Sequence, residues 1–273
     1  MLSKDEIKDY FILEKSHAKK ELGQNFLVNK KIIEEIVSLV YLKKNDVLLE
    51  IGPGLGSLTD DLIGKCDNYT VVEYDAKFVD FLMRSYADKN IIIVKNNILK
   101  YKNYDANKVI GNLPYYITSD ILLYVAKNYE KLEKAVFMIQ KEAYERITAK
   151  KGTKDYNVLN IILDYAFDIT KNMNVSKTSF FPIPQVDSVV ITLKRKPCDF
   201  NYIKPLFTCT RAMFLNRRKT IFNNLFSLVK NKEQTSEILK NLNIDQKVRA
   251  ESLDLEDFIK LTNELLKLEV IKL

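Results

Sequence analysis

The chain is poor in the two residue types that most often build metal sites and nucleophilic centres. Among its 273 residues it has one histidine, His17, and three cysteines, Cys66, Cys198 and Cys209. A single histidine excludes a multi-histidine metal site, and we expect His17 at the surface, which disfavours a histidine-based triad. The cysteines lack the spacing of metal ligands, and an odd number does not build a disulfide framework. The sequence therefore predicts no metal site and a reducing, cytoplasmic compartment.

Long apolar runs are also missing. No run approaches the roughly 20 residues that a membrane-spanning helix needs, and the charged start Met1–Glu6 lacks the apolar core of a secretory signal. Hydrophobic residues supply 47% and charged residues 29%, as in a soluble globular protein. The length suffices for one sizeable α/β domain and a small appendage. A net charge of +7 suits a nucleic-acid partner, although it also suits an ordinary lysine-rich protein.

A glycine-rich loop follows the first clear apolar strand. The segment Glu50–Gly56 reads Glu-Ile-Gly-Pro-Gly-Leu-Gly, and Ser57 and Thr59 then offer hydroxyls for the start of a helix. Glycines at this place let the backbone approach a ligand closely. The Gly-x-Gly-x-Gly spacing is one residue tighter than in dinucleotide-binding loops and is typical of S-adenosylmethionine sites, whose cofactor has no pyrophosphate. Glu73 ends a second strand about 20 residues later, where an acid binds ribose hydroxyls. A glycine-rich turn without a ligand remains the alternative.

The segment Asn112–Tyr115, Asn-Leu-Pro-Tyr, is the most specific chemical motif. The Asn carbonyl and neighbouring main-chain carbonyls can accept both N–H bonds of an exocyclic amine, and the Tyr ring can stack on the base that carries it. Pro114 brings no N–H of its own, so the local carbonyls stay free to face a ligand. Alone, the motif could be a strand-ending turn. The upstream glycine loop favours methylation of a planar amino group.

Strand and helix patterns alternate from about Asp46 onward. The expected strands are Val47–Ile51, Tyr69–Glu73, Ile91–Val94, Lys108–Ile110 and Ala135–Gln140, and the expected helices include Lys77–Tyr86 and Asp120–Lys127, the latter capped by Thr118 or Ser119. Such alternation predicts a parallel sheet with helices on both faces. Ligands bind such sheets outside the carboxyl ends of the strands. The glycine loop, Glu73, the segment after Val94 and Asn112 all fall at such ends, so we expect them on one rim.

The pattern changes in the second half of the chain. Asp155–Ala166 has helical spacing, and Asp168–Val175 and Val189–Lys194 read as strands. The loop Ser179–Ser188 between these strands contains two prolines at i and i+2, which stiffen it and expose its aromatics. Pro197 marks a boundary, beyond which apolar residues recur only at helical spacing. We therefore predict an α/β domain at residues 1–197 and a small all-helical domain at residues 198–273.

Taken together, these residues resemble the ribosomal RNA adenine N6-dimethyltransferase family of the KsgA type. The stretches that carry the resemblance are Gly23–Leu27, Glu50–Gly56, Glu73, Asn112–Thr118, Gln140–Glu142, Phe180–Ser188 and Phe214–Thr220. They cover nearly the whole chain, and their combination in this order is highly specific. The Arg-Arg-Lys-Thr stretch and the length of the tail resemble the small-subunit branch more than the macrolide-resistance (Erm) branch.

The resemblance implies a fold and a reaction. The fold is a Rossmann-like S-adenosylmethionine-dependent methyltransferase domain followed by a helical RNA-binding domain. The reaction puts two methyl groups from S-adenosylmethionine on each N6 of two adjacent adenines in the 3′-terminal hairpin of 16S, small-subunit, rRNA, as a step of ribosome maturation. The implied substrate is a partly assembled 30S-type particle, and we expect a monomeric enzyme without a membrane partner.

The resemblance also assigns roles to single residues. The implied cofactor residues are Asn25, Leu27, Gly52, Gly54, Glu73, Asn97 and Asn112. The implied catalytic residues are Asn112, Leu113, Pro114 and Tyr115, with Phe180 helping to hold a flipped base. One position departs from the family pattern, because Asn97 stands where the family usually has an Asp that bonds the cofactor adenine. An Asn carbonyl can still accept from that amino group, so the departure puts cofactor affinity in doubt.

Basic residues fall in three groups. These are Lys15, Lys19 and Lys20; Arg146, Lys150, Lys151 and Lys154; and Arg211, Arg217, Arg218 and Lys219. Each group could be no more than a solvated face. The family resemblance favours RNA contacts for Arg146, Arg211 and the triplet Arg217–Lys219.

The implied chemistry rests on positioning and electrostatics, without a metal or a strong general base. The target adenine must leave its stack to reach the pocket. Three alternatives stay open. The chain could be an Erm-type large-subunit rRNA methyltransferase, a non-catalytic RNA-binding assembly factor on the same scaffold, or a methyltransferase for small molecules or proteins. The helical tail argues against the first, the intact Asn112, Pro114 and Tyr115 against the second, and the basic tail against the third.

Overall fold

The computed structural model of the chain describes residues 2–18 and 23–272. It divides into two compact units, of which the first holds the residues up to Tyr144 together with Asp168–Arg195. The second holds Glu145–Phe167 and the residues from Lys196 onward. The sequence-based boundary at residue 197 places Glu145–Phe167 in the first domain. In the structure, helix α7 (Val158–Ala166) in that segment packs against α8 (Ile203–Phe214), which explains its grouping with the C-terminal helices.

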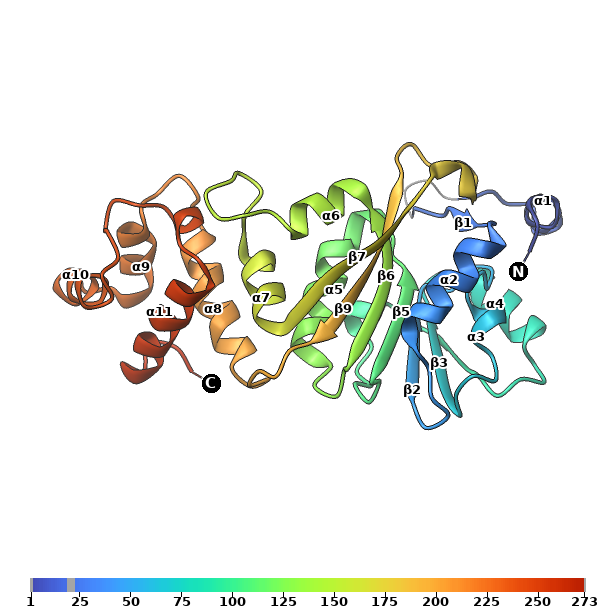
Figure 1. Cartoon of the computed structure of the whole chain (residues 1–273), viewed down its shortest axis with the longest axis horizontal. Coiled ribbons are helices and arrows are strands. Elements are labelled where there is room, and N and C mark those ends of the chain that lie inside the picture. Colours follow the sequence, from blue (N-terminus) through green and yellow to red (C-terminus); the bar gives the residue numbers. More distant parts are fainter. Residues whose placement is uncertain (1, 19–22, 273) are drawn as a thin grey trace. The chain divides into compact units, whose positions relative to one another are not determined.

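The first unit is built around a seven-stranded sheet of order β4-β3-β2-β5-β6-β9-β7 (Figure 1). The strands are β2 (Val47–Ile51), β3 (Asn68–Glu73), β4 (Ile92–Lys95), β5 (Lys108–Asn112), β6 (Lys134–Gln140), β7 (Phe167–Val175) and β9 (Ser188–Arg195). Strands β2 to β6 pair in parallel, which confirms the predicted Rossmann-like architecture. β9 runs antiparallel to β6, so the sheet is parallel over the five strands predicted to be so and mixed beyond them. Neighbouring parallel strands usually need a crossover helix between them, and the chain between β7 and β9 has only short elements.

Helix α2 (Lys30–Val40) covers one face of this sheet. Its buried residues recur at helical spacing and are Ile33, Ile36, Val37 and Val40. They share a core with residues that point to the same face of four strands, Leu48, Ile110, Val136 and Val190. The side chain of Asn29 caps the helix by accepting from the Ile32 N–H. This packing holds the parallel strands in register, so that Ile51 pairs with both Val72 and Gly111.

Two predicted helix caps are wrong because the hydroxyls are used elsewhere. Helix α3 (Thr59–Leu62) has Leu58 at its N-cap without a side-chain cap, and the Thr59 hydroxyl instead donates to Glu50 at 2.8 Å. Helix α5 (Thr118–Asn128) begins at Thr118 itself, whose hydroxyl donates to the Pro114 carbonyl at 3.0 Å. Both hydroxyls therefore fasten the segments that carry the predicted site. The remaining helices of this unit include α1 (Lys4–Leu13) and α4 (Ala76–Ser85), and the division of the chain after Tyr144 falls within α6 (Lys141–Ile147).

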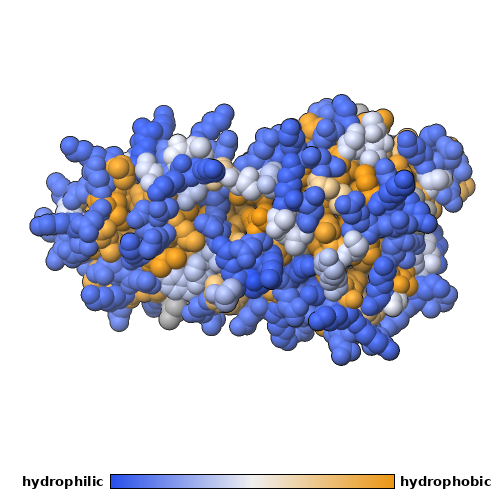
Figure 2. Space-filling view, viewed as in Figure 1, coloured by the Kyte–Doolittle hydropathy of each residue, from blue (hydrophilic) through white to orange (hydrophobic). Residues whose placement is uncertain are grey.

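The second unit is helical, as the sequence predicts. Besides α7 and α8 it contains α9 (Ile221–Val229), α10 (Lys232–Asn241) and α11 (Leu255–Lys267). Of the apolar residues that recur at helical spacing there, Ile221, Leu225, Ile238, Leu239, Leu253, Phe258, Leu261 and Leu265 are buried, whereas Leu228 and Leu242 are partly buried. Within residues 2–18 and 23–272, no helix combines the length and apolar character needed to cross a membrane. Figure 2 shows hydrophilic side chains over most of the visible face.

Candidate active site

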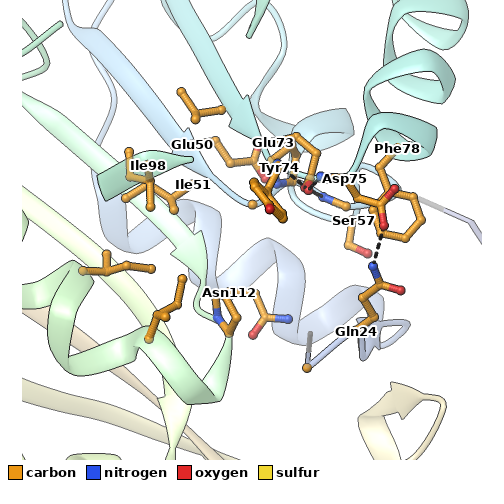
Figure 3. A pocket seen from close by; sticks show the side chains of 18 of the residues that line it. Gln24, Glu50, Ile51, Ser57, Glu73, Tyr74, Asp75, Phe78, Ile98 and Asn112 are labelled. Atoms are coloured by element: carbon orange, nitrogen blue, oxygen red, sulfur yellow. Dashed lines mark hydrogen bonds between the residues drawn. The ribbon is translucent and has the colours of Figure 1, made fainter. Parts of the chain in front are cut away.

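The carboxyl ends of the parallel strands open into a cavity of about 390 Å³ (Figure 3). The four features predicted to share a rim all line it, namely the glycine loop at Gly52 and Gly54, then Glu73, Asn97 and Asn112. In Figure 3, Asn112 and Glu73 lie on opposite sides of the pocket. Because the parallel register aligns the carboxyl ends of the strands, residues that are distant in the sequence meet at that edge of the sheet.

The glycine loop needs its glycines for two different reasons. Gly52, Gly54 and Gly56 all have positive φ, at 65°, 56° and 80°. A Cβ on Gly54 would lie 3.1 Å from the ring of Phe26, which also lines the cavity. A Cβ on Gly56 would lie 2.3 Å from the hydroxyl of Tyr86. The third glycine therefore makes room for a packed tyrosine, while the first two shape the cavity wall.

Glu73 joins the end of β3 to this loop. One carboxylate oxygen accepts from the Tyr74 and Asp75 N–H groups at 2.7 and 2.8 Å, and the other accepts from the Gly54 N–H at 3.0 Å. Burial is the largest influence and raises the pKa of Glu73 above its usual value, although these backbone bonds act in the opposite direction. A carboxylate offers about four acceptor positions, so roughly one is left for a ligand hydroxyl.

A second buried acid, Glu50, is a part of the cavity wall that the sequence did not single out. Its carboxylate accepts from the hydroxyls of Thr59 and Tyr69. Burial raises the pKa of Glu50 to about 7, and these two hydrogen bonds oppose that rise. The sequence feature that could have pointed to Glu50 is its place as the first residue of the glycine loop. Glu50 ties the helix after the loop to β3.

Asn112 is held in one orientation by the N-terminal segment. Its amide nitrogen donates to the main-chain carbonyl of Asn25 at 3.2 Å. A carbonyl can only accept, so the Asn112 amide must turn its nitrogen to Asn25 and its Oδ1 away from it. The next residue, Leu113, donates its N–H to the Met138 carbonyl at 3.0 Å. The motif therefore presents a fixed acceptor, Oδ1, at the cavity.

The carbonyls after Asn112 are not equivalent. The Pro114 carbonyl already accepts from the Ile117 N–H at 3.3 Å and from the Thr118 hydroxyl at 3.0 Å. Because the Pro114 carbonyl already accepts two hydrogen bonds, the carbonyl of Leu113 is the better second acceptor for an amine. The neighbouring tyrosines also differ, since Tyr116 lines the cavity and is 55% exposed, whereas Tyr115 is half-buried and lies outside the cavity lining.

Asn97 lines the cavity, but one acceptor position of its side chain is occupied by a hydrogen bond within its own turn. Its Oδ1 accepts from the Leu99 N–H at 2.9 Å and so caps the short helix Ile98–Lys100. That donor fixes the amide orientation, because an amide nitrogen could not accept it. The Nδ2 donor is then the group that an Asp at this position would replace with a second acceptor oxygen.

The N-terminal motif and Phe180 meet in a small second sheet. Strand β1 (Phe26–Leu27) pairs antiparallel with β8 (Phe180–Phe181), so that Leu27 lies opposite Phe180. Asn25 and Leu27 line the cavity. Phe180 is fully buried in the same core cluster as Leu27 and lies outside the cavity lining. The expectation that the proline loop exposes this aromatic is therefore wrong, because its ring packs inward, and its role at a flipped base stays a prediction.

The cavity has further polar members that the sequence did not indicate. Gln24 donates to the Asp75 carboxylate at 3.1 Å, and both residues line the wall beside Phe78 (Figure 3). Tyr74 is 62% exposed at the mouth. The signal for Tyr74 and Asp75 was their position directly after Glu73. Within residues 2–18 and 23–272, no group of three His, Cys, Asp or Glu residues could hold a metal ion.

The predicted RNA-binding residues all lie in the second unit. Arg146, Arg211, Arg217, Arg218 and Lys219 are exposed there. Arg217 also has a structural contact, because its guanidinium donates to the Tyr156 carbonyl at 3.1 Å. Tyr156 packs edge-on against Phe214, with ring centroids 6.2 Å apart. These contacts join Tyr156, two residues after the lysine-rich loop 150–154, to Arg217 and to the helix that precedes the triplet Arg217–Lys219. Lys19 and Lys20 lie outside the described residues.

Fold and site together define the class of S-adenosylmethionine-dependent methyltransferases. The parallel strands, the glycine loop after β2 and the acid that ends β3 meet at one cavity. The residues fit such a cofactor, since the loop glycines leave the wall free of side chains and Glu73 keeps an acceptor position for a ribose hydroxyl. Gly52 faces open space, with no atom within 4 Å of where a Cβ would stand.

The chain belongs to the ribosomal RNA adenine dimethylase family, whose model matches residues 15–267. It is 39% identical over 264 residues to ribosomal RNA small subunit methyltransferase A of Francisella tularensis subsp. novicida, covering 92% of this chain and 98% of that protein. It is 38% identical over 257 residues to the protein of the same name from Mycoplasma mycoides, covering 90% of this chain and 97% of the other.

Solved structures agree on the fold. A dimethyladenosine transferase from Plasmodium falciparum has a TM-score of 0.75 at 27% identity, covering 89% of this chain and 98% of that chain. The 23S rRNA methyltransferase ErmE has a TM-score of 0.62 at 22% identity, covering 88% of this chain and 99% of that chain. At that identity the second likeness concerns the fold alone.

Proposed function

We propose that this protein dimethylates N6 of two adjacent adenines in the 3′-terminal hairpin of small-subunit rRNA, using S-adenosylmethionine. The observation that carries the proposal is the amide of Asn112, which is oriented by its bond to Asn25 and lines the same cavity as the glycine loop. The small-subunit target is supported by the relatives of 39% and 38% identity, which are named small subunit methyltransferases.

The chain's residues would act on the target amine by hydrogen bonding. The N6 lone pair of adenine is delocalised into the ring and is a poor nucleophile. Oδ1 of Asn112 and the Leu113 carbonyl would each accept one N–H, which favours a nitrogen that moves toward tetrahedral geometry. When bound, S-adenosylmethionine supplies an electrophilic methyl group. Tyr115 would fix the plane of the adenine by stacking, and the gain is mainly positioning.

Substrate binding would fall to the second unit. Arg146, Arg211, Arg218 and Lys219 offer exposed positive charge, and such charges contact phosphates without reading bases. Arg217 would both contact RNA and hold the two basic segments together through Tyr156. We further propose that the enzyme is a cytoplasmic monomer and that its substrate is a partly assembled small subunit.

The experiment is a map of N6-dimethyladenine in rRNA from cells with and without this gene. Loss of two adjacent dimethyladenines in the small-subunit rRNA, restored by the wild-type gene but not by Asn112→Ala, is the expected result. We expect Asn112→Ala to reduce methyl transfer by orders of magnitude and to reduce cofactor affinity much less, the smaller loss arising because Asn112 lines the cofactor cavity and holds Asn25. Loss of a large-subunit methylation together with macrolide resistance would support the Erm-type alternative instead.

A further inference from the structure

Helix α1 is an element that the proposed mechanism does not use (Figure 1). It ends at Leu13, and the family model begins its match at residue 15. Ser3 and Glu6 cap its first turn reciprocally through a capping box, which fixes where the helix begins. Its buried residues are Ile7 and Tyr10, which are 1% and 7% exposed. The helix is therefore packed onto the first unit.

Aromatic rings connect α1 to two residues of the cavity wall. Phe26 and Phe78 both line the cavity and meet edge-on, with ring centroids 5.6 Å apart. Phe11 of α1 lies against Phe26, with centroids 5.9 Å apart. Tyr10 lies 6.1 Å from Phe78 and 5.3 Å from Phe11. The four rings thus form a closed circuit, two on the helix and two in the wall, and ring pairs of this kind stabilise beyond the area that they bury.

Hydrogen bonds and an ion pair fasten α1 to helix α4. The Tyr10 hydroxyl donates to the Lys77 carbonyl at 3.2 Å, and the Lys77 ammonium donates to the Glu14 carbonyl at 2.8 Å. Arg84, in the last turn of α4, pairs with the Glu14 carboxylate at 3.1 Å. Lys77 directly precedes Phe78, so these bonds fix the backbone next to the cavity wall.

Phe26 also contacts the glycine loop and adjoins the residue that orients the catalytic amide. Its ring lies 3.1 Å from the place of a Cβ on Gly54, so it covers that loop closely. Leu55 of the loop belongs to the same apolar cluster. The residue before Phe26 is Asn25, whose carbonyl accepts from the amide of Asn112. A displaced Phe26 would therefore disturb both the glycine loop and the support of Asn112.

We propose that α1 is a clasp that holds two walls of the cofactor cavity together, with Tyr10 and Phe11 as positioning residues for Phe26 and Phe78. Neither α1 residue lines the cavity, so each acts through the ring in front of it. While the rings are held, a larger fraction of the protein has a binding-competent wall, and the apparent affinity for S-adenosylmethionine rises with that fraction. The inference concerns the cofactor site and does not depend on which RNA is methylated.

The test is the affinity of the full-length protein for S-adenosylmethionine, measured by isothermal titration calorimetry without RNA. Phe11→Ala should bind about fivefold more weakly, because it removes the ring behind Phe26 and lowers the competent fraction. Phe11→Leu keeps an apolar side chain and should lose about twofold. Leu13→Ala is the matched control, since Leu13 is 81% exposed on the same helix and should leave the affinity unchanged.

A role in stability alone gives a different result. Phe11→Ala would then melt at a lower temperature but bind with wild-type affinity wherever it is folded, and that result would overturn the proposal. If Phe11→Ala does not fold, wild-type affinity in Phe11→Leu would overturn it in the same way. The titration contains no RNA, so a different RNA target would contradict the proposed function and leave this result unchanged.

Hydrogen exchange gives a second measurement, made without cofactor. The Val28 N–H donates to the Ser179 carbonyl at 2.9 Å, and β1 before it pairs with β8. In both Phe11 variants the amides of residues 26–28 should exchange about fivefold faster than in the wild type, because β1 opens more often once Phe26 is released. Leu13→Ala should exchange like the wild type. Equal exchange in the wild type and both Phe11 variants would overturn the proposal.

Discussion

Replacing Glu73 by Ala separates the role of this acid in the cofactor site from its role in folding. The change removes the acceptor that we assign to a ribose hydroxyl. A hydrogen bond to a charged group is worth roughly 1.5–3 kcal/mol, so affinity for S-adenosylmethionine should fall by about tenfold or more. The same change leaves the N–H groups of Gly54, Tyr74 and Asp75 without their carboxylate.

The cost to folding should be smaller than three lost bonds suggest. Burial raises the pKa of Glu73 despite its backbone donors, so desolvation of the charge offsets much of what those donors contribute. Glu73→Gln is the informative companion. One amide oxygen can still accept from Tyr74 and Asp75, but the amide nitrogen would face the Gly54 N–H, two donors together.

Isothermal titration calorimetry with S-adenosylmethionine gives the affinity, and thermal unfolding shows whether each variant is folded. Both Glu73 variants should bind at least tenfold more weakly while melting cooperatively. Glu133→Gln is a matched control, because Glu133 pairs with Lys108 and lies outside the cavity lining. Wild-type affinity in folded Glu73→Ala would remove Glu73 from the cofactor site.

Three further outcomes are expected. Burial raises the folded-state pKa of Glu50 to about 7, so the protonated side chain stabilises the fold below pH ~4.5, and this stabilisation is lost as pH rises through about 7. In urea unfolding, the free energy of unfolding of the wild type should fall over that range by up to about 3 kcal/mol more than that of Glu50→Gln. An equal pH dependence of the two proteins would refute this. Asn97→Asp should bind S-adenosylmethionine about fivefold more tightly by calorimetry, since a carboxylate adds an acceptor, and weaker binding would mean that this position does not meet the cofactor adenine. Arg218→Ala and Lys219→Ala should each lower the salt slope of RNA binding by about one unit without loss of stability. Arg217→Ala should lower the slope in the same way and also lower the melting temperature, because its bond to Tyr156 is lost. An unchanged slope in all three variants would mean that the RNA contacts lie elsewhere, and residues 146–154 would be tested next.

The rim of the cavity could be predicted because its determinants are local. Each parallel strand is a short apolar run, and the polar or glycine residue at its end is visible beside it, as with Glu73 after Val72. Parallel pairing then brings such ends together without further information. The cofactor wall at Gly52, Gly54, Asn97 and Asn112 follows from this rule.

The parts that were missed depend on contacts between distant residues. The hydrogen bond that orients Asn112 goes to the carbonyl of Asn25, 87 positions earlier, and no local sequence pattern predicts it. Phe180 has polar residues before it and two prolines after it, a pattern that suggests an exposed loop. Pairing of β8 with β1 nevertheless buries its ring against the core. The hydroxyls of Thr59 and Thr118 look like helix caps until their partners, Glu50 and the Pro114 carbonyl, are known.

The interleaved order of the two units limits how this protein can be dissected. The chain leaves the first unit after Tyr144, returns at Asp168 and leaves again after Arg195. A fragment cut at residue 197 would keep α7 but lose α8, and with it the partners of Tyr165 and Tyr156, which pack against Tyr202 and Phe214. Such a fragment would expose an apolar helix, and residues 198–273 alone would lack the same helix. Deletion variants would thus report on solubility, and substitutions at single surface positions are the route to separating RNA docking from methyl transfer.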